Sequence, residues 1–322
     1  MKSVLYIVVP CYNEEESIQQ TGQVLCEKLN ELMASGEAAE SSRILFVDDG
    51  SKDSTWNLIA ELCDQKDEIQ GIKLAHNKGH QNALIAGLMT AKEHADIAIS
   101  TDADLQDDVN AINEMIEKYH AGADIVYGVR NSRKKDSFFK RSTAHCFYKM
   151  MKWLGAETVY NHADFRLMSK RALEALAQYK EVNLFLRGIV PMLGFQTDYV
   201  YYERGERTAG ESKYPLRKMM AFAWEGITSL SITPIRFITS LGTTLFVISL
   251  FMMAYSVIRK LMGATVTGWS SIAVSLWMIG GLVLLSIGIV GEYIGKIYLE
   301  TKARPRYIVE EEKVSESKEN EN

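Results

Sequence analysis

Two aspartates one residue apart, Asp102 and Asp104, follow an apolar run that ends at Ile99, and Gln106 comes directly behind them. A short apolar run of this kind is typical of a buried strand, and open α/β sheets bind their ligands at the carboxyl ends of strands. Hard oxygen atoms suit Mg²⁺ or Mn²⁺, which leave coordination positions for substrate phosphates. We therefore predict a divalent metal site at Asp104 and Gln106, with Asp102 beside it, and chemistry on a diphosphate.

These side chains need a scaffold, and the pattern of the first 200 or so residues predicts one. Apolar runs alternate with segments of helical periodicity, which is typical of βαβ units and a mainly parallel sheet. We expect strands at 4–9, 43–47, 69–75, 96–100, 124–127, 164–168 and 195–202, and helices at 14–33, 53–64, 79–94, 109–119, 169–178 and 184–193. The fold class is therefore α/β.

Two stretches of 22 residues without a charge, 237–258 and 269–290, are each long enough to cross a hydrocarbon core about 30 Å thick. Seven Lys and Arg residues flank the outer ends of the pair, and only Arg259 and Lys260 lie in the connector. By the positive-inside rule, we expect a transmembrane hairpin with both chain ends in the cytoplasm. The location predicted is the inner (cytoplasmic) membrane, as a multi-pass protein with a cytoplasmic catalytic domain.

The chain thus divides into four expected parts: a catalytic domain at 1–215, an interfacial amphipathic segment at 216–236, a hairpin at 237–295 with spans at about 237–258 and 269–294, and a tail at 296–322. The end of the tail, from Glu310, carries six Glu and two Lys without apolar periodicity, and we expect it to be disordered. The four cysteines show no paired spacing, which argues against a zinc site or a disulfide framework.

Six motifs, in this order, resemble those of family 2 glycosyltransferases. The likeness is closest to the polyprenyl-phosphate glycosyltransferases, a group that includes dolichyl-phosphate mannose synthase and bactoprenol glucosyltransferase. Relatives commonly have a proline soon after the acidic run, whereas Asp108 and Val109 stand here. The motifs are Val9-Pro10-Cys11-Tyr12-Asn13-Glu14, Val47-Asp48-Asp49-Gly50-Ser51, Asn77-Lys78-Gly79-His80, Asp102-Ala103-Asp104-Leu105-Gln106-Asp107, Asp164-Phe165-Arg166 and Gly210-Glu211-Ser212-Lys213-Tyr214.

The resemblance implies a GT-A fold, a nucleotide-sugar donor, a divalent metal and a lipid phosphate acceptor. It also implies that Pro10, Tyr12 and Glu14 hold the base and ribose beside Asp49, and that Asp164 faces the donor sugar. The residue types agree, since a tyrosine ring can stack on a base and carboxylates can accept hydrogen bonds from it or from ribose hydroxyls.

A polyprenyl phosphate acceptor is already an anion at neutral pH, so its attack needs no strong general base. Cationic side chains that position it matter more, and guanidinium groups bind phosphate in a bidentate fashion. The segment from Arg130 to Arg141 holds six basic residues, and we predict that these two arginines bind the acceptor phosphate. Ser212 and Lys213 are expected to contact the substrates from a closing loop.

The function predicted is inverting sugar transfer from a nucleotide sugar, best matched by UDP-glucose, to undecaprenyl phosphate for modification of a cell-envelope glycan. UDP-GlcNAc, UDP-galactose and GDP-mannose stay open as donors. A processive polysaccharide synthase and a non-catalytic membrane scaffold are the alternatives. Processive synthases that resemble this fold usually carry a Gln-x-x-Arg-Trp run for the growing chain, and its absence from this sequence disfavours the first alternative. The partners expected are the donor, the lipid acceptor and membrane lipids, without nucleic acid, and homo-oligomer formation stays open.

Overall fold

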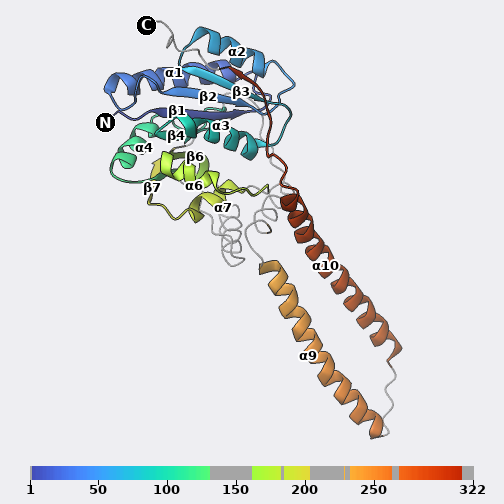
Figure 1. Cartoon of the computed structure of the whole chain (residues 1–322). Helices are drawn as coiled ribbons and strands as arrows, with labels where there is room; N and C mark the ends of the chain where they lie inside the picture. Colours follow the sequence, from blue (N-terminus) through green and yellow to red (C-terminus); the bar gives the residue numbers. More distant parts are fainter. Residues whose placement is uncertain are drawn as a thin grey trace. The chain divides into compact units, whose positions relative to one another are not determined.

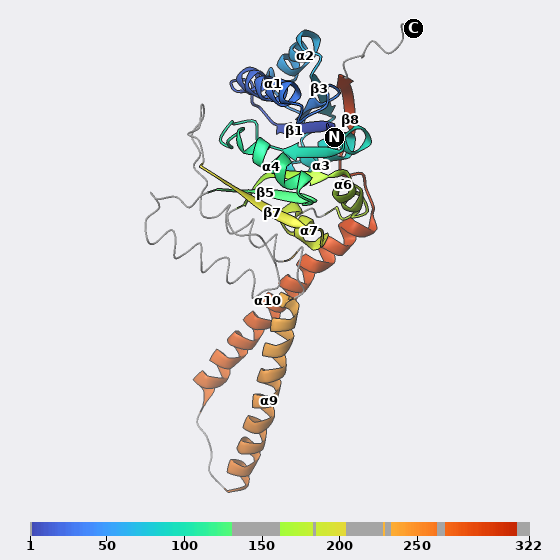
Figure 2. The ribbon, with the colours of Figure 1, turned by 90° about the vertical axis from the view of Figure 1, so that its left-hand side faces the viewer.

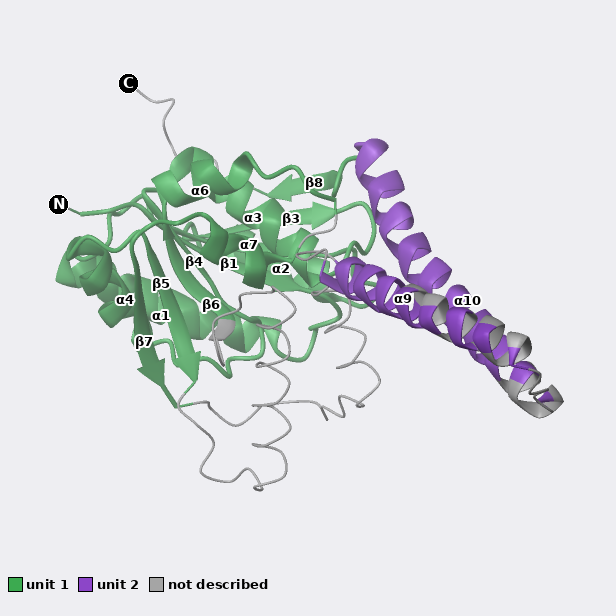
Figure 3. Cartoon of the chain, turned by 90° about the horizontal axis from the view of Figure 1, so that it is seen from below, with its two compact units in different colours: residues 1–145, 158–215, 304–322 green, residues 146–157, 216–303 purple. Residues whose placement is uncertain are grey.

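The computed structural model describes residues 2–130, 162–182, 185–203, 228, 233–262 and 268–313. These form two compact units (Figures 1 and 3). The catalytic unit contains the described residues up to 203 together with 304–313, and the helical unit contains those between 228 and 303. The predicted site residues Arg141, Ser212 and Lys213 lie outside the described residues.

The described part of the catalytic unit holds a sheet of eight strands in the order β7-β5-β6-β4-β1-β2-β3-β8. The pairs β1/β2, β1/β4, β2/β3 and β5/β7 are parallel, whereas β6 runs antiparallel to β4 and β5, and β8 antiparallel to β3. The prediction of an α/β fold with a mostly parallel sheet is confirmed. The strands are β1 (Leu5–Cys11), β2 (Arg43–Asp48), β3 (Ile69–Leu74), β4 (Ile97–Ser100), β5 (Ile125–Arg130), β6 (His162–Ser169), β7 (Thr197–Tyr202) and β8 (Val309–Lys313).

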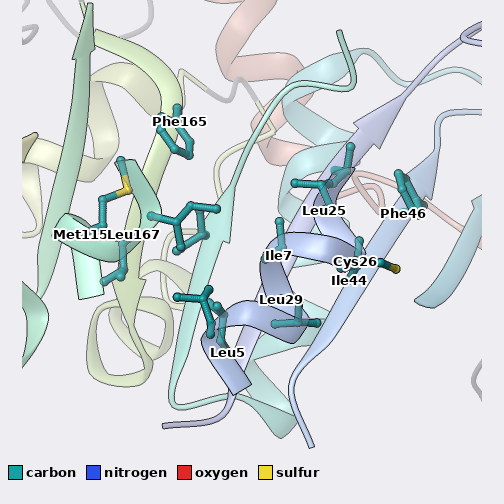
Figure 4. Packing of buried hydrophobic residues seen from close by; sticks show 14 of the residues in the cluster. Leu5, Ile7, Leu25, Cys26, Leu29, Ile44, Phe46, Met115, Phe165 and Leu167 are labelled. Carbon is teal, nitrogen blue, oxygen red and sulfur yellow. The ribbon is translucent and has the colours of Figure 1, made fainter. Parts of the chain in front are cut away.

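Helices cover both faces of this sheet (Figures 1 and 2). On one face, apolar side chains of α1 (Ile18–Ser35), α2 (Thr55–Gln65) and α4 (Ala111–His120) share one core cluster with alternate strand residues, among them Leu5 and Ile7 (Figure 4). This alternation is the period of two that a strand imposes on its side chains.

The opposite face carries α3 (His80–His94), which packs on β1 and β2 and also contacts α6 (Lys170–Ala177). A Cβ on Gly87 of α3 would lie 2.4 Å from Cγ1 of Val8, so only glycine allows the helix to approach β1 this closely. On the same side, the backbone N–H of Leu186, the first residue of α7 (Leu186–Met192), donates to Oε1 of Gln81 in α3. Within the described residues, the sheet therefore forms the middle of three layers.

The segment after the last long helix returns to the sheet as β8. Its Glu311 accepts a hydrogen bond from the Trp56 indole N–H at 3.0 Å, and Glu310 pairs with Lys73 at 3.0 Å. Disorder from Glu310 onward was the expectation, and it is wrong for the first four residues. The free edge of β3 supplies backbone partners that outweigh the low apolar content of this segment. Residues 314–322 lie outside the described part.

The helical unit consists mainly of α9 (Thr233–Leu261) and α10 (Trp269–Thr301). Within the described residues, one helical segment, Met278–Thr301, is long and apolar enough to cross a membrane by length and composition. Large apolar side chains of α10 are exposed, such as Leu276 and Leu284. The segment predicted as interfacial, 216–236, overlaps the start of α9 at residues 233–236. Helix α10 extends to Thr301, beyond residue 296, where the tail was expected to start.

Candidate active site

The chemistry-bearing residues come from different loops that meet at one edge of the sheet. The parallel register aligns the carboxyl ends of β1, β2, β3 and β4, and those of β5 and β7, while antiparallel β6 begins at the same edge. This edge is where α/β folds bind ligands. It receives residues 12–14 after β1, Asp49 after β2, His80 after β3, Asp102 to Asp107 after β4, Arg130 at the end of β5, Asp164 at the start of β6 and Tyr202 at the end of β7.

The loop after β4 is held in an unusual conformation. Leu105 has a φ of 51°, in the left-handed region that a branched side chain adopts at a cost, and such strain is concentrated at functional sites. The buried hydroxyl of Thr21 in α1 donates to the carbonyl of Ala103 at 2.7 Å. The backbone N–H of Gln106 donates to Oδ1 of Asp104 at 3.2 Å. These contacts fix the loop that carries the predicted metal ligands.

The Asp102 carboxyl has a pKa of about 6, well above its ordinary value. Burial is the main cause; nearby His80 opposes it, and the charges of Asp107, Asp164 and Asp104 add to it. Three other carboxylates therefore lie close enough to Asp102 to add to the effect of burial on its pKa.

The donor set fits a divalent cation. Asp102, Asp104 and Gln106 offer carboxylate and amide oxygens, which suit Mg²⁺ and Mn²⁺, and a cation would relieve the repulsion that raises the Asp102 pKa. Among the described residues, no group of three or more His, Cys, Asp and Glu side chains is arranged around a metal position. Two carboxylates with an amide and substrate phosphates are a normal set for these ions.

The β1 and β2 loops form the neighbouring part of the edge. Asp49 is buried, and its two oxygens accept the backbone N–H groups of Lys78 and Gly79 at 2.7 and 2.8 Å. Burial nevertheless raises its pKa. Gly50 has a φ of 65°, and a Cβ there would lie 2.7 Å from the carbonyl carbon of His76. The β2 loop is thus packed directly on the loop that precedes α3.

The residues predicted to hold the base and ribose differ in accessibility. Tyr12 is 40% exposed at the end of β1, which leaves its ring available for stacking. Pro10 is buried within β1. The backbone N–H of Glu14 donates to the Thr55 hydroxyl at 2.8 Å, and its carboxylate accepts from Ser17 at 2.8 Å. The structure therefore orders this loop, and Tyr12 is its exposed aromatic group.

Asp164 is the centre of a charged cluster. Oδ1 accepts from Nη2 of Arg166 at 2.7 Å, and Arg187 donates to both oxygens, from Nε at 3.3 Å and from Nη2 at 3.1 Å. His80 Nε2 lies 3.6 Å from Asp164 and 3.7 Å from Asp102. Burial alone would raise the Asp164 pKa, but His80 and the two arginines hold it well below its ordinary value. The pKa of His80 is raised because the two carboxylates outweigh the effect of burial.

Arg130, the first residue of the basic segment 130–141, is the last residue of strand β5. Its Nη2 donates to Oδ1 of Asp107 at 2.9 Å, and its Nε donates to the Tyr202 hydroxyl at 3.2 Å. The Tyr202 hydroxyl in turn donates to Oδ1 of Asp107. The guanidinium therefore lies at the predicted edge, but with two fixed partners.

Sequence reasoning did not assign roles to Asp107, Tyr202 or Arg187. Asp107 was visible as part of the acidic run, but its carboxylate faces Arg130, 23 positions away. Tyr202 and Arg187 carry no local signal. The position of β7 beside β5 brings Tyr202 to this edge, and helix α7, which is hydrogen-bonded to α3 at its start, brings Arg187 to Asp164. The structure places His80, the last residue of the third motif, between two carboxylates.

Comparison with known proteins gives a consistent result. The family model described as glycosyl transferase family 2 matches residues 6–177. The uncharacterized glycosyltransferase YkoT of Bacillus subtilis (strain 168) is 56% identical over 95% of this chain and 91% of its own length. The bactoprenol glucosyl transferase of Shigella phage SfV is 40% identical over 95% of this chain and 98% of its own length. A mannosyltransferase from Pyrobaculum calidifontis aligns with 94% of this chain and 86% of its own at 16% identity and a TM-score of 0.43, too low to match individual site residues.

Proposed function

The chain belongs to glycosyl transferase family 2 and is a glycosyltransferase, and from this premise we propose that it transfers a sugar from a nucleoside diphosphate sugar to a polyprenyl phosphate. The observation that carries the proposal is the 40% identity, along nearly the full length of both chains, with a protein named bactoprenol glucosyl transferase. We further propose UDP-glucose as the donor, undecaprenyl phosphate as the acceptor and inversion at the anomeric carbon, for modification of a cell-envelope glycan.

The donor is proposed to bind across the loops after β1, β2 and β4. Tyr12 supplies an exposed ring for the base, while Glu14 and Asp49 lie beside it at the same sheet edge. Asp49 also fixes the loop before α3 through two backbone hydrogen bonds, so part of its role is to shape the site. Pro10, buried in β1, supports the position of Tyr12.

Asp104 and Gln106, with Asp102, are proposed to hold Mg²⁺ or Mn²⁺. When bound, such a cation neutralises charge on the departing nucleoside diphosphate. The acceptor phosphate oxygen forms a bond to the anomeric carbon as the bond from that carbon to the donor's β-phosphate oxygen breaks, and the nucleoside diphosphate leaves with the electron pair. No proton has to be removed from the acceptor, because the phosphate is ionised at neutral pH.

Arg130 and Arg141 are proposed to position the acceptor phosphate, and Ser212 and Lys213 are proposed to contact the substrates from a closing loop. Of these four residues, only Arg130 lies within the described residues. Asp164 is proposed to act as an ionised anchor near the donor sugar. Its low pKa makes it a poor proton acceptor at neutral pH, which agrees with an acceptor that needs no base. Arg187 donates a hydrogen bond to Asp164 and His80 lies within ion-pair distance of it, so both belong to the same cluster.

The helical unit is proposed to anchor the enzyme as a two-span hairpin in the inner membrane. The chain ends and the catalytic unit are then cytoplasmic. The proposed parts remain 1–215, 216–236, 237–295 and 296–322, except that α9 already begins at Thr233, α10 continues to Thr301 and β8 belongs to the sheet. A reporter fused after Asn322 should be active in the cytoplasm. A reporter that is active on the outer side would overturn this topology.

The deciding experiment is a transfer assay with the full chain in detergent. Undecaprenyl phosphate is supplied with UDP-glucose, UDP-GlcNAc, UDP-galactose or GDP-mannose, and lipid-linked sugar is detected by mass spectrometry. We expect product with one preferred donor in the presence of Mg²⁺ or Mn²⁺, and the anomer of the product reports inversion. The absence of lipid-linked product with all four donors, from protein that is folded by thermal melting, would contradict the proposal.

A further inference from the structure

Arg130, Asp107 and Tyr202 form a closed triangle of hydrogen bonds at the sheet edge. Arg130 donates to Asp107 and to Tyr202, and Tyr202 donates to the same oxygen of Asp107. Arg130 and Tyr202 are direct register partners at the carboxyl ends of the parallel strands β5 and β7. The Tyr202 ring is fixed by an edge contact with buried Phe165 at 5.4 Å between ring centroids. Two rigid strands and one packed ring therefore set the position of the triangle.

Arg130 is more accessible to solvent than Asp107. The Asp107 side chain is 2% exposed, whereas that of Arg130 is 22% exposed. An anion that enters from solvent meets the guanidinium, and the carboxylate lies behind it. With Nε and Nη2 both held, the plane of the guanidinium is fixed, which is the arrangement that bidentate phosphate binding requires.

The second oxygen of Asp107, Oδ2, is buried and has no hydrogen-bond partner among the residues that the structure describes. Such an atom costs stability, and unsatisfied buried groups in folded proteins are few. An asparagine or an apolar residue would avoid a buried charge here, so a carboxylate at this position has a cost in stability. The partner that makes use of its charge is Arg130.

On the premise of the proposed function, we propose that Asp107 and Tyr202 are positioning residues that orient Arg130 toward the acceptor phosphate. Neither needs to touch the substrates. Because Asp107 follows Gln106 directly in the chain, the same short loop supplies the proposed metal ligands and the residue that aims the acceptor-binding arginine. The relative placement of the donor diphosphate and the acceptor phosphate is thus set by one loop.

The test compares Asp107→Asn, Tyr202→Phe, Arg130→Ala and the double variant Asp107→Asn/Arg130→Ala in the full chain. Direct titration with undecaprenyl phosphate in detergent measures acceptor affinity without depending on the donor sugar, and titration with UDP measures donor-side binding. The matched control is Asp124→Asn, which removes a buried carboxylate paired with Arg171 just before the opposite end of β5. Thermal melting verifies that each variant is folded.

We expect Asp107→Asn to weaken acceptor binding roughly tenfold, the effect of losing one charge-assisted contact, with UDP binding and the control unchanged. Tyr202→Phe should weaken acceptor binding in the same direction by a smaller factor. Since Asp107 acts through Arg130, Asp107→Asn should have no further effect once Arg130 is alanine.

An equal loss from Asp107→Asn in the wild-type and Arg130→Ala backgrounds would overturn the inference, as would an unchanged affinity in both. Should Asp107→Asn not fold, wild-type acceptor affinity in Tyr202→Phe would overturn it alone. If the wild-type chain itself does not bind undecaprenyl phosphate, the proposed function fails and this inference fails with it. If the wild type binds undecaprenyl phosphate and Asp107→Asn binds it equally well, only this inference is contradicted and the proposed function stands.

Discussion

Replacement of Asp164 by asparagine tests whether this carboxylate is a charge anchor as well as a site residue. In the structure it is the acidic partner of Arg166, whose side chain is 1% exposed, and it also binds Arg187 and His80. Within the described part of the chain, Nε and Nη1 of Arg166 have no hydrogen-bond partner, so the Asp164 charge is the main compensation there for a buried cation. Asp164→Asn keeps the shape of the side chain and removes that charge.

Breaking a buried ion pair costs about 3–5 kcal/mol, because the remaining charge is left uncompensated. For a unit of this size, each kcal/mol lowers the melting temperature by about 2–4 °C, so we expect a decrease of about 6–20 °C. The Arg187 side chain is 38% exposed, and an ion pair this accessible contributes about 0–1 kcal/mol. Arg187→Ala should therefore lower the melting temperature far less than Asp164→Asn.

The assay is thermal unfolding of the full chain in detergent. Because the folded pKa of Asp164 is lower than its unfolded value, its contribution is complete above the unfolded pKa, near 4, and is lost as the pH falls further. The Asp164 carboxylate itself therefore contributes fully between pH 6 and pH 8. The difference between wild type and Asp164→Asn should nevertheless decrease as the pH rises through the raised pKa of His80, because the neutral imidazole no longer pairs with the Asp164 charge. Adding Arg166→Met to Asp164→Asn should restore part of the stability, since the orphaned charge is removed. A melting temperature of Asp164→Asn equal to that of the wild type would refute the reasoning.

Three further predictions concern other parts of the catalytic unit. Asp104→Ala should reduce metal-dependent transfer at least about 100-fold while the protein still folds, and full activity of this variant in excess chelator would exclude a metal role. Gly50→Ala should lower the melting temperature and UDP affinity, because its Cβ would meet the backbone of His76. Gly194 is the control, since it has a similar φ but no atom near its Cβ position. Gly194→Ala should therefore show only the conformational cost of about 1–2 kcal/mol. Deletion of 309–322 should lower the melting temperature by several degrees through loss of the β8 pairing, and an unchanged value would show that β8 contributes no stability.

The order and type of most elements in the catalytic unit could be predicted from local pattern. The expected strand at 43–47 matches β2 at Arg43–Asp48, and the expected helix at 79–94 matches α3 at His80–His94. Apolar runs with a period of two and helical runs with a period of 3.6 are properties of neighbouring residues, so they are readable without tertiary information. The position of Asp102 after β4 follows from the same pattern.

Pairings between distant segments could not be predicted in this way. The sequence of Val309–Lys313 is acidic and only the exposed edge of β3 makes it a strand, with Glu311 bound to Trp56. Its secondary structure is decided by a partner more than 230 positions away, which no local window contains.

For the site, the sequence by itself determined that the loop from Asp102 to Asp107 offers oxygen ligands to a divalent cation and suits chemistry on a diphosphate. The reason is that residue types fix which groups can donate and accept hydrogen bonds or bind a cation. Only the tertiary structure decided that Asp107 faces Arg130 and Tyr202, and that His80 lies between Asp102 and Asp164. The physical reason is that β6 inserts between β4 and β5 while β7 lies beyond β5, an order set by packing of whole strands. That order brings charges from distant loops within hydrogen-bond or ion-pair distance. The low pKa of Asp164 results from this proximity, because His80, Arg187 and Arg166 surround its carboxylate.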